Sequence, residues 1–277
     1  MDAFLYFYQN LPRYIDPVAF SLGPFPIRWY SLMYIAAFLT VYLLILYRIQ
    51  KKEVSYSKDF LENIFLASFL GLLIGARLGY VFFYDPDYFL KNPLAIFYPF
   101  NPENGEFSGI FGMSYHGGLV GVILASWTYT WLQGVNFLKL ANFIAPAVPA
   151  GYFFGRIGNF LNGELFGKIT GSSWGMHFGL DNFLRYPNQL CEAFFEGIVL
   201  FVLLWTLRNN PKSKDKMLFG YLLGYGIFRF LLDFGRESHE KSLLGFLEIS
   251  QLLSLSMAII GLFLLLFSRV VIRRKMG

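Results

Sequence analysis

Seven long apolar stretches constrain the fold of this chain more than any other feature of its sequence. Each is long enough, or nearly so, to cross the roughly 30 Å hydrocarbon core of a bilayer as a helix. They lie at residues 27–47, 60–83, 113–133, 139–159, 190–207, 217–234 and 246–268. Charged residues make up only 15% of the chain, whereas soluble domains carry roughly a quarter. The sequence therefore predicts one all-α integral membrane domain over residues 1–277, with seven transmembrane helices.

Lysine and arginine residues indicate the direction of these helices. Basic clusters follow the first, fifth and seventh stretches, at residues 48–58, 208–216 and 269–275. With seven helices all three clusters fall on one side, and an excess of Lys and Arg marks the cytoplasmic side. We therefore expect the N-terminus outside and the C-terminus in the cytoplasm. The outer loops are expected to be short, although they are longer and less basic than the inner loops. Residues 1–26, rich in Phe and Tyr, are expected to form an interfacial arm on the membrane surface.

Glycines at helical spacing indicate how two of the helices pack. Gly71, Gly75 and Gly79 share one face of the second stretch, and Gly117 and Gly121 repeat the same spacing in the third. Small residues let helix backbones approach closely in lipid. This pattern favours tight helix packing over a role in chemistry.

Polar residues gather toward the outer ends of the apolar stretches. An ionised side chain in hydrocarbon costs at least a few kcal/mol, so such residues are functional candidates. The first four stretches contribute Tyr30, Arg77, His116, Arg156 and Asn159. The sixth contributes a single stripe of Tyr225, Arg229, Asp233 and Arg236. The inner halves are apolar, which weighs against a channel or an ion-coupled transporter.

Arginine dominates this outer set. Four arginines outnumber the plausible local acids, which are Glu164, Asp233 and Glu192. The guanidinium group is the preferred partner of phosphate oxygens. The pattern predicts an outward-facing pocket for an anionic phospholipid headgroup, with Glu164 and the asparagines orienting its hydroxyls or capping the fourth helix. The structural alternative is that Arg229 pairs with Asp233 and Arg156 with Glu164, only to hold helices together.

Histidine and cysteine contribute little beyond one candidate. His116 is the only histidine near the outer level, and an imidazole side chain suits a general base. The three histidines lie far apart, and Cys191 is the only cysteine. We therefore expect no metal site. We also expect no nucleic-acid partner.

Several segments resemble one known family. The segment "GRIGNFLNGELFG" (155–167) meets every fixed position of the pattern G-R-x-G-N-F-x-N-x-E-x-x-G of the prolipoprotein diacylglyceryl transferases. Six further segments resemble family segments in the same order: "IRWYSLMY" (27–34), "GARLGYVFFY" (75–84), "MSYHGGLVGV" (113–122), "YPNQLCEAFFEG" (186–197), "YGIFRFLLDFGR" (225–236) and "SQLLS" (250–254). The resemblance covers nearly the whole chain.

The resemblance implies a transferase of lipoprotein biosynthesis in the bacterial inner membrane, with its site at the periplasmic face. Such an enzyme moves the sn-1,2-diacylglyceryl group of phosphatidylglycerol to the lipobox cysteine of a prolipoprotein and releases glycerol 1-phosphate, without a cofactor. The implied catalytic residues are His116, Arg229 and Tyr225. The implied phosphatidylglycerol-binding residues are Arg156, Arg229, Asn159, Glu164, Tyr30 and Gly167. Secondary candidates are Arg77, Gly117, Asp233, Arg236 and Gln189.

The sequence also departs from the family pattern. The family segment H-P-S-Q-L-Y-E reads "YPNQLCE" (186–192) here, so a histidine is missing and Cys191 stands where Tyr is common. Asp233 stands where Glu is common, and the short loop between Gly167 and Arg185 predicts a reduced outer head. The alternative functions are a headgroup phosphotransferase or phosphatase without a protein acceptor, and a non-catalytic lipid-binding protein.

Overall fold

The computed structural model describes residues 3–23, 25–98, 112–179, 181–237 and 247–273. Parts of several predicted segments lie outside these residues: 1–2 and 24 of the arm, 99–111 of the first outer loop, 246 of the last stretch, and 274–275 of the last basic cluster. The chain divides into two compact units. One comprises residues 1–48 and 141–277, and the other comprises residues 49–140.

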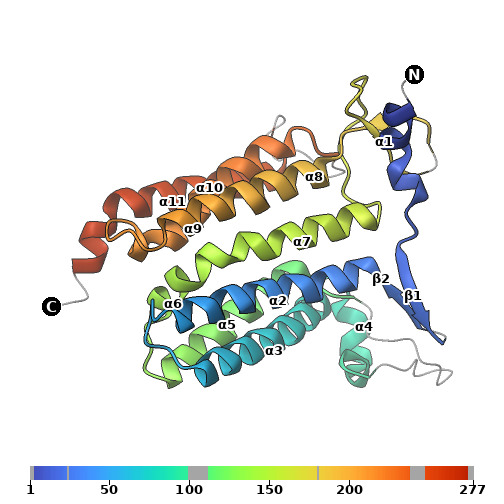
Figure 1. Ribbon diagram of the computed structural model, residues 1–277. Coiled ribbons are helices and arrows are strands. Elements are labelled where there is room, and N and C mark those ends of the chain that lie inside the picture. Colours follow the sequence, from blue (N-terminus) through green and yellow to red (C-terminus); the bar gives the residue numbers. More distant parts are fainter. Residues whose placement is uncertain (1–2, 24, 99–111, 180, 238–246, 274–277) are drawn as a thin grey trace. The chain divides into compact units, whose positions relative to one another are not determined.

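The larger unit is built from long helices that run side by side (Figure 1). These are α2 (Trp29–Gln50), α7 (Val148–Leu161), α10 (Met217–Asp233), α11 (Ile249–Arg273) and a continuous segment formed by α8 (Asn188–Glu192), the π-helical turn η3 (Ala193–Val199) and α9 (Leu200–Leu207). The short helix α6 (Phe137–Ile144) and the 3₁₀ turn η2 (Ala145–Ala147) precede α7. A second 3₁₀ turn, η4 (Lys214–Lys216), precedes α10.

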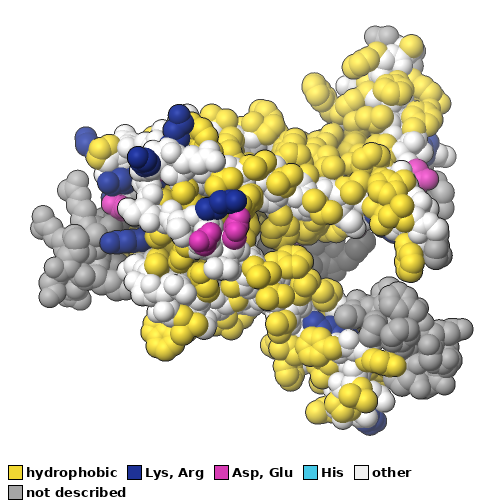
Figure 2. Space-filling model, turned by 60° about the horizontal axis from the view of Figure 1, so that its bottom comes forward, with side chains coloured by type: hydrophobic (Ala, Val, Ile, Leu, Met, Phe, Trp, Pro, Cys, Tyr) yellow, Lys and Arg dark blue, Asp and Glu magenta, His cyan; other side chains and the backbone are white. Residues whose placement is uncertain are grey.

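The helices are apolar enough for a membrane. Among the described residues, five helical segments could cross a bilayer by length and composition: Trp29–Gln50, Lys58–Phe83, Phe137–Leu161, Asn188–Leu207 and Ile249–Phe267. Hydrophobic side chains cover most of the face seen in Figure 2. Helices also lie at the other two predicted positions, but α10 has only 17 residues and carries two charged side chains. The chain is therefore a mostly helical, multi-pass membrane protein.

The smaller unit is a tight helix pair. Its helices α3 (Lys58–Phe83) and α5 (Tyr115–Leu132) touch through glycine, as the spacing predicted. A Cβ atom built on Gly121 would lie 2.0 Å from the carbonyl oxygen of Gly71, and one on Gly75 would lie 2.4 Å from that of Gly117. These distances are far below van der Waals contact, so only glycine permits this approach. Two short helices follow α3, namely α4 (Pro86–Lys91) and the 3₁₀ turn η1 (Pro93–Ile96).

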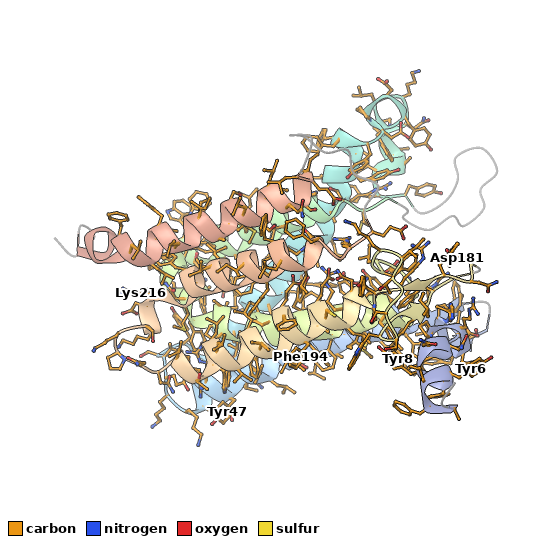
Figure 3. The ribbon with its side chains drawn as sticks, turned by 90° about the horizontal axis from the view of Figure 1, so that it is seen from above. Tyr6, Tyr8, Tyr47, Asp181, Phe194 and Lys216 are labelled. Carbon is orange, nitrogen blue, oxygen red and sulfur yellow. The ribbon has the colours of Figure 1, made fainter. Side chains whose placement is uncertain are left out.

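The N-terminal segment of the larger unit packs against a loop region at one end of its helices. Helix α1 (Ala3–Tyr14) leads to the antiparallel hairpin of β1 (Val18–Leu22) and β2 (Phe25–Arg28), and the loop region contains the paired strands β3 (Met176–His177) and β4 (Leu184–Arg185). Phe160, Met176 and Phe178 form a small core here. Figure 3 shows Tyr6, Tyr8 and Asp181 at this end and Tyr47 and Lys216 at the opposite end.

Polar contacts tie α1 to this loop region. Tyr8 donates its hydroxyl to the Trp174 carbonyl at 3.0 Å, and Arg13 donates to the Asp181 carbonyl at 2.7 Å. The Arg185 guanidinium donates a hydrogen bond to the Asp181 carboxylate, which lowers the pKa of that carboxyl below its usual range. Aromatic residues on α1, such as Phe4 and Phe7, remain exposed. Residues 3–14 are thus a helix with an apolar exposed face, and its place at a membrane surface stays a prediction.

Candidate functional site

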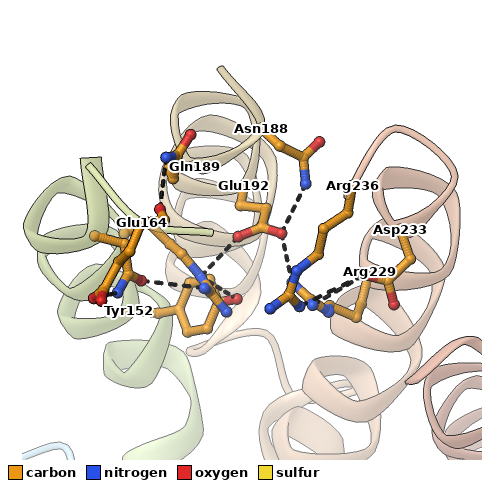
Figure 4. A network of polar contacts seen from close by, with 10 residues as sticks. Tyr152, Glu164, Asn188, Gln189, Glu192, Arg229, Asp233 and Arg236 are labelled. Carbon is orange, nitrogen blue, oxygen red and sulfur yellow. Dashed lines mark hydrogen bonds and ion pairs between the residues drawn. The ribbon is translucent and has the colours of Figure 1, made fainter. Parts of the chain in front are cut away.

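A buried carboxylate joins two arginines from different helices of the larger unit. Glu192, the last residue of α8, has no exposed surface. Its Oε1 lies 2.6 Å from Nη1 of Arg229 on α10, and its Oε2 lies 3.0 Å from Nε of Arg156 on α7 (Figure 4). The side chains of Arg229 and Arg156 are only 9% and 14% exposed. An isolated buried charge is costly in free energy, and the shared ion pairs with Glu192 offset this cost for both arginines.

The local sequence explains how α8 reaches both partners. Asn188, one turn before Glu192, donates from Nδ2 to its Oε1 at 2.9 Å and so orients the carboxylate. The π-helical turn η3 follows directly and packs closely against α7. A Cβ atom built on Gly197 would lie only 2.8 Å from the Cβ of Phe153, so this approach requires glycine. π-Helical turns inside α-helices occur frequently at functional sites. The glycine therefore brings the acidic end of α8 next to the arginine of α7.

Arg156 belongs to a chain of polar contacts toward the end of α7. Its Nε donates to the Tyr152 hydroxyl at 2.6 Å, and its Nη1 donates to Asn159 Oδ1 at 3.2 Å. Asn159 in turn donates to Glu164 Oε1 at 2.8 Å. Tyr30 of α2 interacts with Asn159 and with Glu164. Four of the predicted binding residues therefore form one connected network.

Arg229 and the residues after it form the α10 side of the cluster. Nη2 of Arg229 lies 2.9 Å from Oδ1 of the buried Asp233, and Nη1 of Arg236 lies 3.9 Å from the same oxygen. Tyr225 stands one turn earlier on α10 and makes an edge contact with Tyr152, with ring centroids 5.5 Å apart. The stripe predicted on the sixth stretch is thus joined to the arginine cluster.

Two further predicted residues hold the backbone around the cluster. Gln189, fully buried, donates from Nε2 to the Glu164 carbonyl at 2.6 Å. Gly167 pairs with Arg236 across a β-bridge, and a Cβ there would lie 2.6 Å from the Gly235 carbonyl oxygen. Only glycine allows this approach, so Gly167 fixes the loop that follows Glu164 to the end of α10.

Three predicted residues belong to the smaller unit. Arg77 is buried and donates to the carbonyls of Ala95, Ile96 and Gly112, with 2.7 Å to the first. Gly117 lies in the glycine contact with α3, and His116 is the second residue of α5. The contacts of Arg77 and Gly117 serve the packing of this unit. Phosphate binding by Arg77 and the base role of His116 stay predictions.

The structure combines both sequence interpretations of the arginines. Arg229 pairs with Asp233, as the structural alternative expected. Arg156 reaches Glu164 only through Asn159 and pairs with Glu192 instead. Two largely buried guanidiniums, one on α7 and one on α10, with several donors each can still receive a phosphate group. Among the described residues, no group of three or more His, Cys, Asp or Glu side chains is placed to hold a metal ion.

Three residues of the cluster were not among the predicted site residues. Glu192, Glu196 and Tyr152 all lie in the same layer as the arginines. The available signal was the pair of acids four residues apart within the apolar stretch 190–207, because an acid in hydrocarbon needs a partner. The sequence identifies Glu192 as one of the acids near the arginines. Its partner Arg229, however, is 37 residues away and cannot be assigned from spacing.

The fold and cluster define the chain as a multi-pass helical membrane protein with a buried arginine–carboxylate site. A family model described as prolipoprotein diacylglyceryl transferase matches residues 17–267. The chain therefore belongs to the prolipoprotein diacylglyceryl transferase family. Similar relatives named phosphatidylglycerol–prolipoprotein diacylglyceryl transferase include those of Chlorobaculum tepidum (44% identical, covering 97% of this chain and 95% of the relative), Wolinella succinogenes (43%, 91% and 93%) and Bordetella avium (44%, 90% and 93%).

Proposed function

We propose that this protein transfers the diacylglyceryl group of phosphatidylglycerol to the cysteine thiol of a prolipoprotein and releases glycerol 1-phosphate. The names of the relatives supply the substrates and the reaction. The observation that carries the proposal in this chain is the pair of buried arginines, from α7 and α10, that share Glu192. Paired guanidiniums in a site screened from water suit a lipid phosphate.

In the proposed reaction, Arg156 and Arg229 bind the phosphate and stabilise the negative charge that develops on the leaving glycerol phosphate. The thiolate sulfur attacks the diacylglycerol carbon that carries the phosphate ester oxygen. A carbon–sulfur bond forms, the carbon–oxygen bond breaks, and its electron pair leaves with the phosphate. The thiol proton passes to a base, for which His116 is the candidate from the sequence. Tyr30, Asn159 and Glu164 support Arg156 through their hydrogen-bonded network.

We further propose seven membrane-spanning helices with the N-terminus outside and the C-terminus in the cytoplasm of a bacterial inner membrane. The basic residues 208–216 lie between α9 and α10, opposite to the end at which α1 and Asp181 lie (Figure 3). A cytoplasmic location of basic residues then puts the arginine cluster, near the other ends of these helices, toward the outer leaflet. Phosphatidylglycerol and the signal peptide of the prolipoprotein would both reach it from the membrane.

A lipid headgroup phosphotransferase or phosphatase is the alternative function, since it would use the same arginines. The two are separated by measuring glycerol phosphate release from phosphatidylglycerol by the purified protein, with and without a peptide that contains the lipobox cysteine. The proposed transferase releases glycerol phosphate only with the peptide. Equal release without the peptide would contradict the proposal and favour hydrolysis.

We expect Cys191→Ala to keep nearly full transferase activity. Cys191 is a free cysteine on α8 and precedes Glu192 in the sequence, so a covalent relay through its thiol has to be tested. The family pattern has Tyr at this position, so a relay through this sulfur is not part of the proposed reaction. The variant is assayed for peptide modification beside the unsubstituted protein. Loss of most activity in a folded Cys191→Ala protein would show that the sulfur takes part.

A further inference from the structure

The cluster contains buried carboxylate oxygens that receive no hydrogen bond. Glu196 is completely buried, and within the described part of the chain neither of its oxygens meets a donor at full hydrogen-bond geometry, although the Tyr152 hydroxyl interacts with this carboxylate as a donor. Oε2 of Glu192 also lacks a hydrogen-bond donor, although the charge of Arg156 lies 3.0 Å away. A buried polar group without a partner costs about 1–3 kcal/mol, and more if it is charged. The Tyr152 hydroxyl has one proton and can serve only one of these three oxygens, so the others need further donors.

Glu196 faces the arginine cluster. It lies four residues after Glu192 within η3, and a π-helical turn contains slightly more than four residues because its hydrogen bonds join i to i+5. The two carboxylates therefore point to nearly the same side. Glu196 interacts electrostatically with Glu192, Arg229 and Arg156, and through a side-chain hydrogen bond with Tyr152. Phe194, labelled in Figure 3, is 50% exposed and Ile198 is 42% exposed, in contrast to the fully buried Glu192 and Glu196 of the same helical segment.

The hydrogen bonds and ion pairs of the nearby arginines go to other acceptors. Arg156 donates from Nε to Tyr152 and from Nη1 to Asn159, and Arg229 uses Nη1 for Oε1 of Glu192 and Nη2 for Asp233. The matching ligand for the remaining oxygens is therefore a group that carries hydroxyl donors beside a phosphate. The glycerol headgroup of phosphatidylglycerol has this chemistry, with two hydroxyls attached next to the phosphodiester.

We propose that Glu196, together with Oε2 of Glu192, accepts hydrogen bonds from the hydroxyls of the lipid headgroup and makes the enzyme select a glycerol-bearing phospholipid. This inference rests on the proposed function and deepens it, because it assigns headgroup selection to one carboxylate. A site that is built to hydrogen-bond a hydroxyl rejects an analogue that lacks it, since its buried polar groups are then left unpaired.

The test compares two lipid donors with the same acyl chains. Phosphatidylpropanol carries a propyl group in place of glycerol, so it keeps the phosphodiester and loses both hydroxyls. Transfer to the lipobox peptide is measured for each donor as kcat/KM. We expect the unsubstituted protein to prefer phosphatidylglycerol by at least about tenfold, the value of one hydrogen bond to a charged group. Glu196→Gln is expected to reduce this preference by roughly tenfold through slower use of phosphatidylglycerol, with phosphatidylpropanol nearly unaffected.

The matched control is Glu62→Gln, which removes an exposed acid on α3 that pairs with Lys58 and should leave the preference unchanged. A preference near one in the unsubstituted protein would overturn the inference, even if Glu196→Gln did not fold. An equal loss with both lipids in Glu196→Gln would also overturn it, because a purely structural role affects both donors alike. Absence of transfer from either lipid by the unsubstituted protein would instead contradict the proposed function.

Discussion

Arg156→Ala is expected to lower diacylglyceryl transfer by roughly 1,000-fold, the size of effect seen when a preorganised donor to a developing charge is removed. The Arg156 side chain is only 14% exposed and interacts with Tyr152, Asn159 and Glu192 at distances of 2.6, 3.2 and 3.0 Å. These contacts hold the guanidinium in place before a lipid arrives, so it needs little reorganisation when charge develops on the phosphate. Peptide modification is measured by kcat/KM with phosphatidylglycerol as the donor.

Stability must be separated from catalysis in this experiment. Removing one partner of a buried ion pair can cost about 3–5 kcal/mol, but Glu192 keeps Arg229 and Asn188 in the variant. Arg156→Lys provides a second variant that retains the charge, and a single ammonium cannot reproduce the planar set of contacts. Arg13→Ala, on α1 and outside the cluster, is the control that should retain activity. Substantial transfer by folded Arg156→Ala protein would rule out the phosphate-binding role.

Gly121→Ala is expected to destabilise the smaller unit strongly, whereas Gly155→Ala should be neutral or stabilising. Both glycines lie inside helices, where alanine is favoured by up to roughly 1 kcal/mol. A Cβ on Gly121 would lie 2.0 Å from the Gly71 carbonyl oxygen, while a Cβ on Gly155 would meet nothing within 4 Å. Backbone atoms on α3 cannot move aside like a flexible side chain, so overpacking should cost at least about 1–3 kcal/mol.

The opposite signs make this comparison informative. Thermal unfolding of the two purified variants in the same detergent measures both effects, with the unsubstituted protein as reference. Gly121→Ala should unfold at a lower temperature or fail to accumulate as folded protein. An unchanged unfolding temperature for Gly121→Ala would show that α3 and α5 are not in glycine contact.

The positions of the helices could be predicted because apolar length is a local property of the sequence. Helices lie at all seven predicted stretches, and the glycine spacing of the second and third correctly identified their contact faces. The fourth stretch differs in detail, since it is divided between α6, η2 and α7. Pro146 and Pro149 explain this division, because proline removes a backbone donor within a helix.

The partners of the charged residues could not be predicted. Sequence spacing indicates how deep a residue lies in the membrane, but not which neighbouring helix its side chain faces. Arg77 and Arg156 were expected at the same level, yet Arg77 donates to backbone carbonyls and Arg156 joins a carboxylate. The central role of Glu192 depends on the packing of α8 between α7 and α10. Arg156 lies 36 residues before Glu192 in the sequence, and Arg229 lies 37 residues after it. Long-range packing of this kind leaves no pattern in a single sequence.

The central claim is that the protein attaches a diacylglyceryl group to a cysteine. The most direct measurement incubates the purified protein with phosphatidylglycerol and a lipobox peptide and determines the mass of the peptide. We predict a diacylglyceryl adduct on the cysteine that is absent when the peptide carries alanine at that position. An unmodified peptide in the presence of folded protein and both substrates would contradict the claim.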